Sequence, residues 1–213
     1  GDGTMLRAAR LACAGRSPGI PLLGINFGTV GYMTELEFSE LGLLDGLRDA
    51  GVQTRMMSDA SVSMEDGESG PFPALNETVV CREQAGKILR LTLKCDGHEV
   101  SSYRADGMIV STPTGSSAYN LSAGGPIIDP KLNAFCVCPL AAFTVSSVRP
   151  VVFSPDSVLE ISAEGAAVVT CDGKQVASLP RGGTLTVSRS RSELRLVSLK
   201  NANFYEVMMR KLS

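Results

Sequence analysis

A strand-like run leads into a turn rich in small hydroxyl side chains in the middle of the chain. Met108–Ser111 is apolar and partly β-branched, as in a strand, and Pro113 and Gly115 then end it. A strand that runs into a Gly/Ser/Thr turn and then a short helix exposes backbone N–H groups, which suits a phosphate or a nucleotide. The alternative is a plain polar turn between two elements. The side chains that would serve such a site are Thr112, Thr114, Ser116, Ser117 and Tyr119.

A second candidate anion site lies at the start of the chain. Gly1–Thr4 reads GDGT and precedes Met5–Ala14, whose apolar residues have helical spacing. Glycines around an acid before a helix leave backbone N–H groups where an anion binds, with the Asp2 carboxylate at its rim. The alternative is a structural cap made by Asp2 or Thr4. Because no methionine precedes this motif, we expect an N-terminal portion to be missing.

Composition limits the classes of partner. The 213 residues, 44% of them hydrophobic and 20% charged, are typical of one or two globular domains. A net charge of −2 provides no basic surface for nucleic acid. The longest apolar stretch, Ala134–Val145, is too short for a bilayer and contains Pro139. We therefore expect neither nucleic acid nor membrane among the partners.

The cysteines and the single histidine argue against a zinc site and against a Ser-His-Asp hydrolase. His98 is the only histidine, and no Cys-x-x-Cys pair occurs, so a zinc site has no support. No P-loop motif and no G-x-S-x-G elbow is present. Most of the cysteines lie in apolar runs, where a reduced cysteine behaves as a small hydrophobe, and this favours the cytoplasm. They are Cys13, Cys81, Cys95, Cys136, Cys138 and Cys171.

The first part of the chain has the pattern of the end of a βαβ unit. Pro21–Asn26 is a short buried strand, the loop Gly28–Met33 follows, and Glu37–Ala50 is a helix. Val52–Ser63 has the alternation of a strand. Glu65–Pro73 is rich in turn residues and is expected to be a connection.

From Ala74 onward the pattern becomes all-β. Short strands separated by Gly, Pro and Asp turns predict a sandwich-like domain. Asn203–Leu212 then has the spacing of an amphipathic helix. The predicted strands are 75–83, 87–96, 99–104, 107–112, 134–138, 150–154, 157–163, 166–171, 184–189 and 193–199.

Three stretches together resemble the NAD kinase family. Gly1–Thr4 is similar to the end of its GGDGT motif, and Leu75–Glu77 to its NE motif. Arg104–Pro126 resembles its long signature rich in glycine and threonine. Gly28–Thr34 also resembles an LGFLT-type loop of the family. The similarity covers essentially the whole chain, in the same order and at similar spacing.

The resemblance implies an α+β fold. Residues 1–60 would be the remainder of an N-terminal Rossmann-like α/β domain, and 61–200 a sandwich-like, NAD-binding β domain. Residues 201–213 would form a C-terminal helix that returns to the first domain. NAD lies partly between subunits in the family, which implies a homodimer or homotetramer.

The resemblance also implies a reaction, in which the γ-phosphate of ATP, or a phosphate of polyphosphate, moves to the 2′-hydroxyl of the adenosine ribose of NAD. Asp2 would be the general base, and Gly3 would let the phosphate chain approach the backbone. Since no P-loop lysine is present, Mg²⁺ or Mn²⁺ would neutralise the phosphates without a dedicated protein cage.

The same resemblance assigns binding residues. Asn76 and Glu77 would hydrogen-bond NAD. Arg104 would contact a phosphate or another subunit, and Asp106 would accept a hydrogen bond from a base or amide N–H. The dinucleotide pocket would be lined by Ser117, Ala118, Tyr119, Asn120, Leu121 and Ser122.

Two regions depart from the family pattern. Pro139–Pro150 stands where the family often reads PHTLS-x-RP, with Phe143 in place of the histidine and one extra residue before Arg149. Ala141 is still expected to contact the ligand. Asp172-Gly173-Lys174 resembles a family DGQ, with lysine for glutamine, and Lys174 would pair with a phosphate or point to water. Arg90 matches a basic position of the family. The alternative is an arginine that is simply exposed to solvent on a strand.

Two other functions fit parts of the sequence. A lipid kinase of the diacylglycerol type shares the Gly-Asp-Gly-Thr element but does not need the Thr114–Tyr119 signature (TGSSAY). The chain also shows no amphipathic face for binding a membrane. A catalytically silent nucleotide-binding fragment would keep the β domain without turnover.

Overall fold

The computed structural model describes residues 2–14, 19–28, 31, 33–65, 67–84, 86–143, 148–200, 204–206 and 208. The chain divides into two compact units. The first consists of Gly1–Arg55 and Ser192–Ser213, and the second of Met56–Arg191. Two long strands, β3 (Gly51–Met64) and β14 (Thr184–Ser198), contribute residues to both units.

The first unit begins with the helix α1 (Asp2–Ala14), as the sequence predicts. Met5 and Ala9 are its buried residues and lie four positions apart, on one face of the helix. The short strands β1 (Ile25–Asn26) and β2 (Leu36–Glu37) pair in parallel. This unit therefore keeps the βα character that the sequence indicates.

The helix predicted at Glu37–Ala50 is present as the 3₁₀ helix η1 (Phe38–Asp49). It begins with a capping box between Glu37 and Glu40. None of its side chains is fully buried. Gly42 and Gly46 lie inside it and weaken the α-helical preference.

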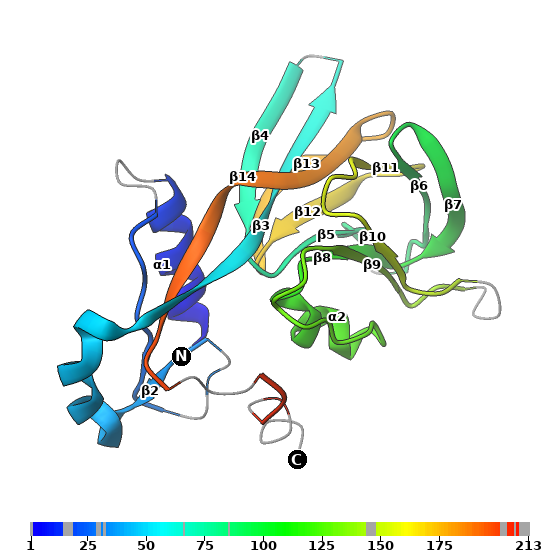
Figure 1. Ribbon diagram of the computed structural model, residues 1–213. Helices are drawn as coiled ribbons and strands as arrows, with labels where there is room; N and C mark the ends of the chain where they lie inside the picture. The colour runs from blue at the N-terminus through cyan, green and yellow to red at the C-terminus, as the bar shows by residue number, and fades with distance from the viewer. Residues whose placement is uncertain are drawn as a thin grey trace. The chain divides into compact units, whose positions relative to one another are not determined.

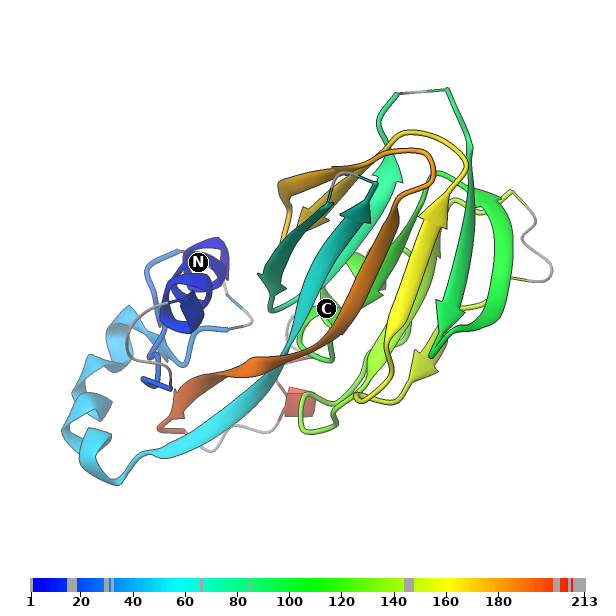
Figure 2. The ribbon, with the colours of Figure 1, turned by 90° about the horizontal axis from the view of Figure 1, so that it is seen from above.

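The second unit contains two six-stranded sheets (Figure 1). Their strand orders are β10-β9-β8-β5-β12-β13 and β4-β3-β14-β11-β6-β7. Figure 2 shows the second sheet from above, with β14 between β3 and β11. Besides β3 and β14, the two sheets contain β4 (Gly67–Ala74), β5 (Glu77–Arg82), β6 (Leu89–Cys95), β7 (His98–Ala105), β8 (Gly107–Ser111), β9 (Phe135–Leu140), β10 (Val151–Phe153), β11 (Leu159–Ala163), β12 (Ala167–Cys171) and β13 (Lys174–Leu179).

One core joins the two sheets of the second unit. Buried side chains from β6 and β11 cluster with side chains from β5, β8, β9 and β12. Leu91, Ile161, Met108 and Phe135 are each fully buried there. Burial of a side chain of this size contributes about 1.5–3 kcal/mol. The sandwich-like β domain predicted from the short strands is therefore confirmed, and it provides a rigid support for the loops at its strand ends.

Two predictions about strands are wrong. Glu65–Pro73, expected to be a connection, contains most of β4, an edge strand paired with β3. Proline is tolerated on an edge strand because its missing N–H faces away from the sheet, and Pro71 and Pro73 lie there. The two strands expected at 184–189 and 193–199 are one continuous strand, β14.

A third difference from the predicted strands is β13, which the sequence does not indicate. Its six residues are mostly exposed or half-buried, so they lack the apolar alternation that marks a strand. Of the predicted helix Asn203–Leu212, Phe204–Glu206 and Met208 are helical, and the remaining residues lie outside the described part of the chain.

Candidate functional site

The hydroxyl-rich turn follows β8 and is fixed to the segment just before β5. The Thr112 hydroxyl donates to the carbonyl oxygen of Leu75 (2.5 Å), and its backbone N–H donates to that of Asn76 (2.9 Å). The Gly115 N–H donates to the Thr112 hydroxyl (3.3 Å). A Cβ at Gly115 would overlap the Asn76 carbonyl group. The turn and the Leu75–Asn76 segment therefore form one packed structure. In Figure 1 the helix α2 (Tyr119–Ser122), into which the turn leads, lies beside β8.

Two short helices continue the turn, η2 (Gly115–Ser117) and α2 (Tyr119–Ser122). The Ser116 hydroxyl donates to the Pro113 carbonyl (2.7 Å) and accepts from the Ile128 N–H (2.9 Å). The predicted strand, turn and short helix are thus confirmed, and a buried serine closes the loop on itself.

Asn120 holds the same loop from inside. Its side chain is fully buried, and its amide donates to the carbonyl oxygens of Ser116 (3.2 Å) and Pro126 (3.0 Å). A Cβ at Gly125 would overlap this amide. The remaining residues of the predicted pocket wall are more accessible: Ser117, Ala118 and Leu121 are half-buried, and Tyr119 and Ser122 are exposed.

Glu77 is the buried acid of this region. Its side chain is only 7% exposed, and within the described residues one carboxyl oxygen has no hydrogen-bond partner. Burial, and next the charge of Asp172, raise the pKa of Glu77 to about 7, while the backbone N–H of Tyr119 lowers it. Near neutral pH this carboxyl group therefore exchanges a proton and has a lone pair available to a ligand.

The raised pKa of Glu77 predicts a change of stability with pH. An acid whose pKa is raised from 4.5 to about 7 on folding binds its proton more tightly in the folded protein. As the pH rises from about 4.5 to about 7, the free energy of unfolding should therefore fall, and Glu77 should account for about 3 kcal/mol of this fall. Urea titrations at pH 4 and pH 8, on either side of both pKa values, measure the fall.

Glu77→Gln is the control for this prediction. Glutamine has nearly the same shape and does not titrate, so the fall should be smaller in the variant by about 3 kcal/mol. Equal pH dependence in the two proteins would show that Glu77 is not the titrating group.

Asp2 lies in the first unit, at the start of α1. Its carboxylate is half-buried and accepts a hydrogen bond from the Met33 N–H (2.9 Å). A Cβ at Gly31 would lie 2.8 Å from this carboxylate and 2.8 Å from the Thr34 hydroxyl. Gly3 is exposed, with no atom near the place of a Cβ. Asp2 is therefore joined to the described part of the loop that resembles the LGFLT type, next to an open backbone at Gly3.

Arg104 and Asp106 make contacts that the sequence did not indicate. The exposed Arg104 guanidinium lies 5.9 Å from the centre of the Phe143 ring, a cation–π distance. Asp106 pairs with Arg82 through two contacts of 3.0 Å. Phe143, which stands where the family often has histidine, therefore packs beside a residue of the signature.

Three other predicted residues are exposed. Arg90 lies 3.5 Å from Glu164, an exposed ion pair that contributes little to stability. Ala141 is exposed and has a φ of +46°. Lys174 is exposed at the start of β13.

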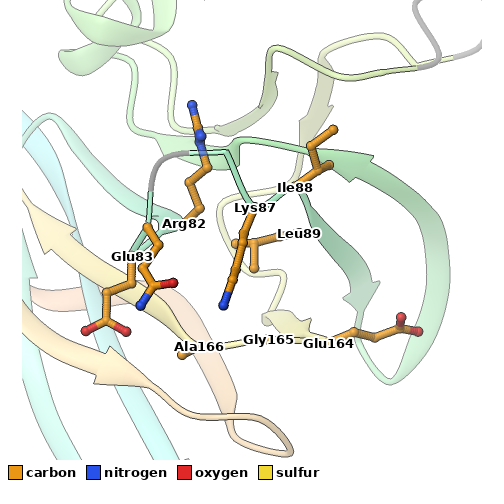
Figure 3. Close-up of a pocket in the computed structure, with 9 residues that line it drawn as sticks. Arg82, Glu83, Lys87, Ile88, Leu89, Glu164, Gly165 and Ala166 are labelled. Carbon is orange, nitrogen blue, oxygen red and sulfur yellow. The ribbon is translucent and has the colours of Figure 1, made fainter.

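A pocket of about 410 Å³ lies elsewhere in the second unit, between the connections β5–β6 and β11–β12. Figure 3 shows Lys87 and Leu89 above the Glu164–Ala166 turn. None of the predicted site residues lines it. In the described part of the chain, no cluster of three or more His, Cys, Asp or Glu residues could hold a metal ion. The described helices include none that is long and apolar enough to cross a bilayer.

The contacts that hold the site together were not predicted, although the residues that make them lie in the motif segments. Thr112 and Gly115 join the turn to Leu75–Asn76, and Asp172 binds the same segment through its carboxylate. Asp172 was noted only as part of the segment that resembles a family DGQ, and the Asp-Gly dipeptide by itself indicates a tight turn.

Family models match along most of the chain. The model described as ATP-NAD kinase N-terminal domain matches residues 1–44, and that described as ATP-NAD kinase C-terminal domain matches residues 75–199. An NAD kinase of Nocardia farcinica is 39% identical over 217 residues, which are 99% of this chain and 66% of the relative. An NAD kinase of Caldanaerobacter subterraneus is 38% identical over 221 residues, 100% of this chain and 76% of the relative.

Solved structures agree with the sequence matches. Yeast NADH kinase complexed with NADH has a TM-score of 0.88 and 26% identity, with 99% of this chain and 63% of that chain covered. An NAD kinase from Archaeoglobus fulgidus in complex with ATP has a TM-score of 0.81 and 32% identity, with 100% of this chain and 80% of that chain covered. The chain thus spans about two thirds of the length of several relatives. The α+β fold predicted from the motifs is confirmed, and the chain belongs to the NAD kinase family.

Proposed function

We propose that this chain carries the NAD- and ATP-binding residues of an NAD kinase. The enzyme would transfer the γ-phosphate of ATP to the 2′-hydroxyl of the adenosine ribose of NAD, which makes NADP. Membership of the family supports the reaction. The observation that carries the binding site is the buried Glu77 carboxyl group, with one oxygen without a partner among the described residues, beside the hydroxyl-rich turn.

Asn76 and Glu77 would bind the sugar of NAD. An ionised carboxylate accepts hydrogen bonds from ribose hydroxyls, and an amide both donates and accepts. Since the pKa of Glu77 is about 7, kcat/KM for NAD should rise with pH up to about that value. Ser117–Ser122 would line the dinucleotide, and within it the buried Asn120 would hold the loop in shape.

Asp2 would be the catalytic base. A ribose hydroxyl becomes a competent nucleophile when a carboxylate accepts its proton as the new bond forms. The Met33 N–H donates a hydrogen bond to the Asp2 carboxylate and holds it in place. The open backbone at Gly3 would admit the phosphate chain.

Further residues outside the turn would complete the site. Arg104 and Lys174 would approach phosphate groups, and Asp106 would accept an N–H from the ligand while it keeps its pair with Arg82. Ala141 would contact the ligand through its backbone. Arg90 pairs with Glu164, and this ion pair is enough to explain an exposed arginine on a strand.

The divalent cation is best described as part of the substrate. Mg²⁺ or Mn²⁺ would arrive on the phosphates of ATP, since the described residues offer no cluster of metal ligands. Polyphosphate remains the alternative donor. We further propose a cytoplasmic homodimer or homotetramer; buried thiols such as Cys136, whose pKa burial raises to about 12, fit a reducing compartment.

The test is formation of NADP by the whole protein. NAD, ATP and MgCl₂ are supplied, and NADP is detected with an NADP-specific dehydrogenase. Diacylglycerol with ATP tests the lipid-kinase alternative, and polyphosphate tests the second donor. NADP formation in the NAD arm supports the proposal. Turnover of diacylglycerol alone would support the lipid kinase, and binding of NAD without any product would support a silent fragment.

A further inference from the structure

Asp172 and Gly173 form a two-residue turn between β12 and β13. The residues on either side, Cys171 and Lys174, pair across the hairpin. Asp172 has a φ of +48° and Gly173 a φ of +73°, as in a type I′ turn. Asp-Gly is a preferred sequence for this turn. The turn alone would therefore explain the aspartate.

The carboxylate of Asp172 reaches beyond its turn. It accepts hydrogen bonds from the backbone N–H groups of Leu75 (3.1 Å), Asn76 (2.7 Å) and Glu77 (3.4 Å). The Asp172 N–H donates in return to the Glu77 carbonyl oxygen (3.0 Å). These partners lie 95 to 97 positions earlier in the chain. One side chain thus holds three consecutive peptide groups.

The position of Asp172 makes these bonds strong. The residue is only 9% exposed, so water competes weakly for its carboxylate. Hydrogen bonds from N–H groups to an ionised carboxylate are about twice as strong as those between neutral groups. A turn that only had to reverse the chain would not need this arrangement.

The segment that Asp172 holds also packs against the hydroxyl-rich turn. The carbonyl oxygens of Leu75 and Asn76 accept hydrogen bonds from Thr112, and Gly115 packs against Asn76. A displacement of Leu75–Glu77 would therefore move the two parts of the proposed NAD site together.

We propose that Asp172 is a positioning residue of the NAD site, which fixes the peptide groups of Leu75–Glu77 and so directs the Asn76 and Glu77 side chains toward the dinucleotide. The inference rests on the function proposed above. Asp172 also acts on Glu77 by its negative charge, which is the second cause of the raised pKa of Glu77. Removal of this charge should lower that pKa.

Asp172→Asn separates positioning from a turn role. Asparagine adopts the same backbone conformation and keeps one acceptor oxygen. Its amide nitrogen cannot accept a hydrogen bond, so at least one of the three bonds from the Leu75–Glu77 N–H groups is lost. We expect KM for NAD to rise about tenfold and KM for ATP to stay within about twofold. The acid limb of kcat/KM for NAD should also move to lower pH, because Glu77 ionises more easily.

Asp96→Asn is the matched control. Asp96 and Gly97 form another hairpin turn with positive φ values, +50° and +80°, and the Asp96 carboxylate accepts the Val158 N–H at 2.8 Å. It lies in the same unit but outside the proposed site. This variant should lower the unfolding temperature without any change in KM or in the pH profile.

The outcomes distinguish this inference from the proposed function. Wild-type NADP formation with the expected KM and pH changes in Asp172→Asn supports both. Wild-type activity with unchanged KM and pH profile in Asp172→Asn overturns the positioning role, whatever the effect on stability. A wild-type protein that makes no NADP overturns the proposed function and, with it, the role of Asp172.

Discussion

Asp2→Asn is expected to lower kcat for NADP formation by about 10²- to 10⁴-fold, the usual contribution of a general base. KM for NAD should stay within about threefold, because the change removes proton transfer and keeps the shape of the side chain. The asparagine oxygen still accepts the Met33 N–H, so the unfolding temperature should change by no more than about 2 °C. Initial rates and a thermal melt of the whole protein measure both effects.

The control for Asp2 is Glu35→Gln. Glu35 also lies in the first unit, and its carboxylate accepts backbone N–H groups of Leu199 (2.5 Å) and Lys200 (2.8 Å). Its substitution tests the loss of a carboxylate that binds the backbone but has no part in the proposed chemistry. A kcat of Asp2→Asn within about threefold of wild type would rule out Asp2 as the base.

Local sequence was enough to predict the central strand, turn and helix. β8 is a short apolar run, and Pro113 and Gly115 fix where it ends. β13 and β4 were missed because their stability comes from neighbouring strands. β13 lacks apolar alternation, and β4 contains two glycines and two prolines that resemble a loop.

The motifs located the candidate site, but its internal support could not be predicted. Glu77 follows from its motif, whereas its raised pKa depends on burial and on Asp172, almost a hundred positions away. Gly115 was predicted only as a strand breaker. Its packing against Asn76 depends on a contact between the ends of two strands, and no local pattern encodes such a contact.

Gly115→Ala is the second substitution with a large expected effect. Gly115 is not among the glycines with positive φ, so its backbone conformation is open to alanine. An alanine Cβ would overlap the Asn76 carbonyl group, and one of the two backbone segments must move. We expect a loss of about 3 kcal/mol in the free energy of unfolding, which corresponds to about 6–12 °C in the unfolding temperature.

The same displacement should impair binding of NAD. Asn76 and Glu77 would shift with the backbone, and a shift of about 1 Å lowers kcat/KM about 10²-fold. Thermal melts and initial rates at varied NAD concentration measure the two losses together.

Gly42→Ala shows why the sign of the stability change is informative. Gly42 also lies in a 3₁₀ helix, and nothing is near the place of its Cβ. Alanine has a higher helix propensity than glycine by up to about 1 kcal/mol, so Gly42→Ala should be neutral or stabilising. Propensity alone predicts the same sign at Gly115, whereas the contact with Asn76 predicts the opposite sign. A Gly115→Ala protein as stable as wild type would therefore show that the turn does not pack on Asn76 as described.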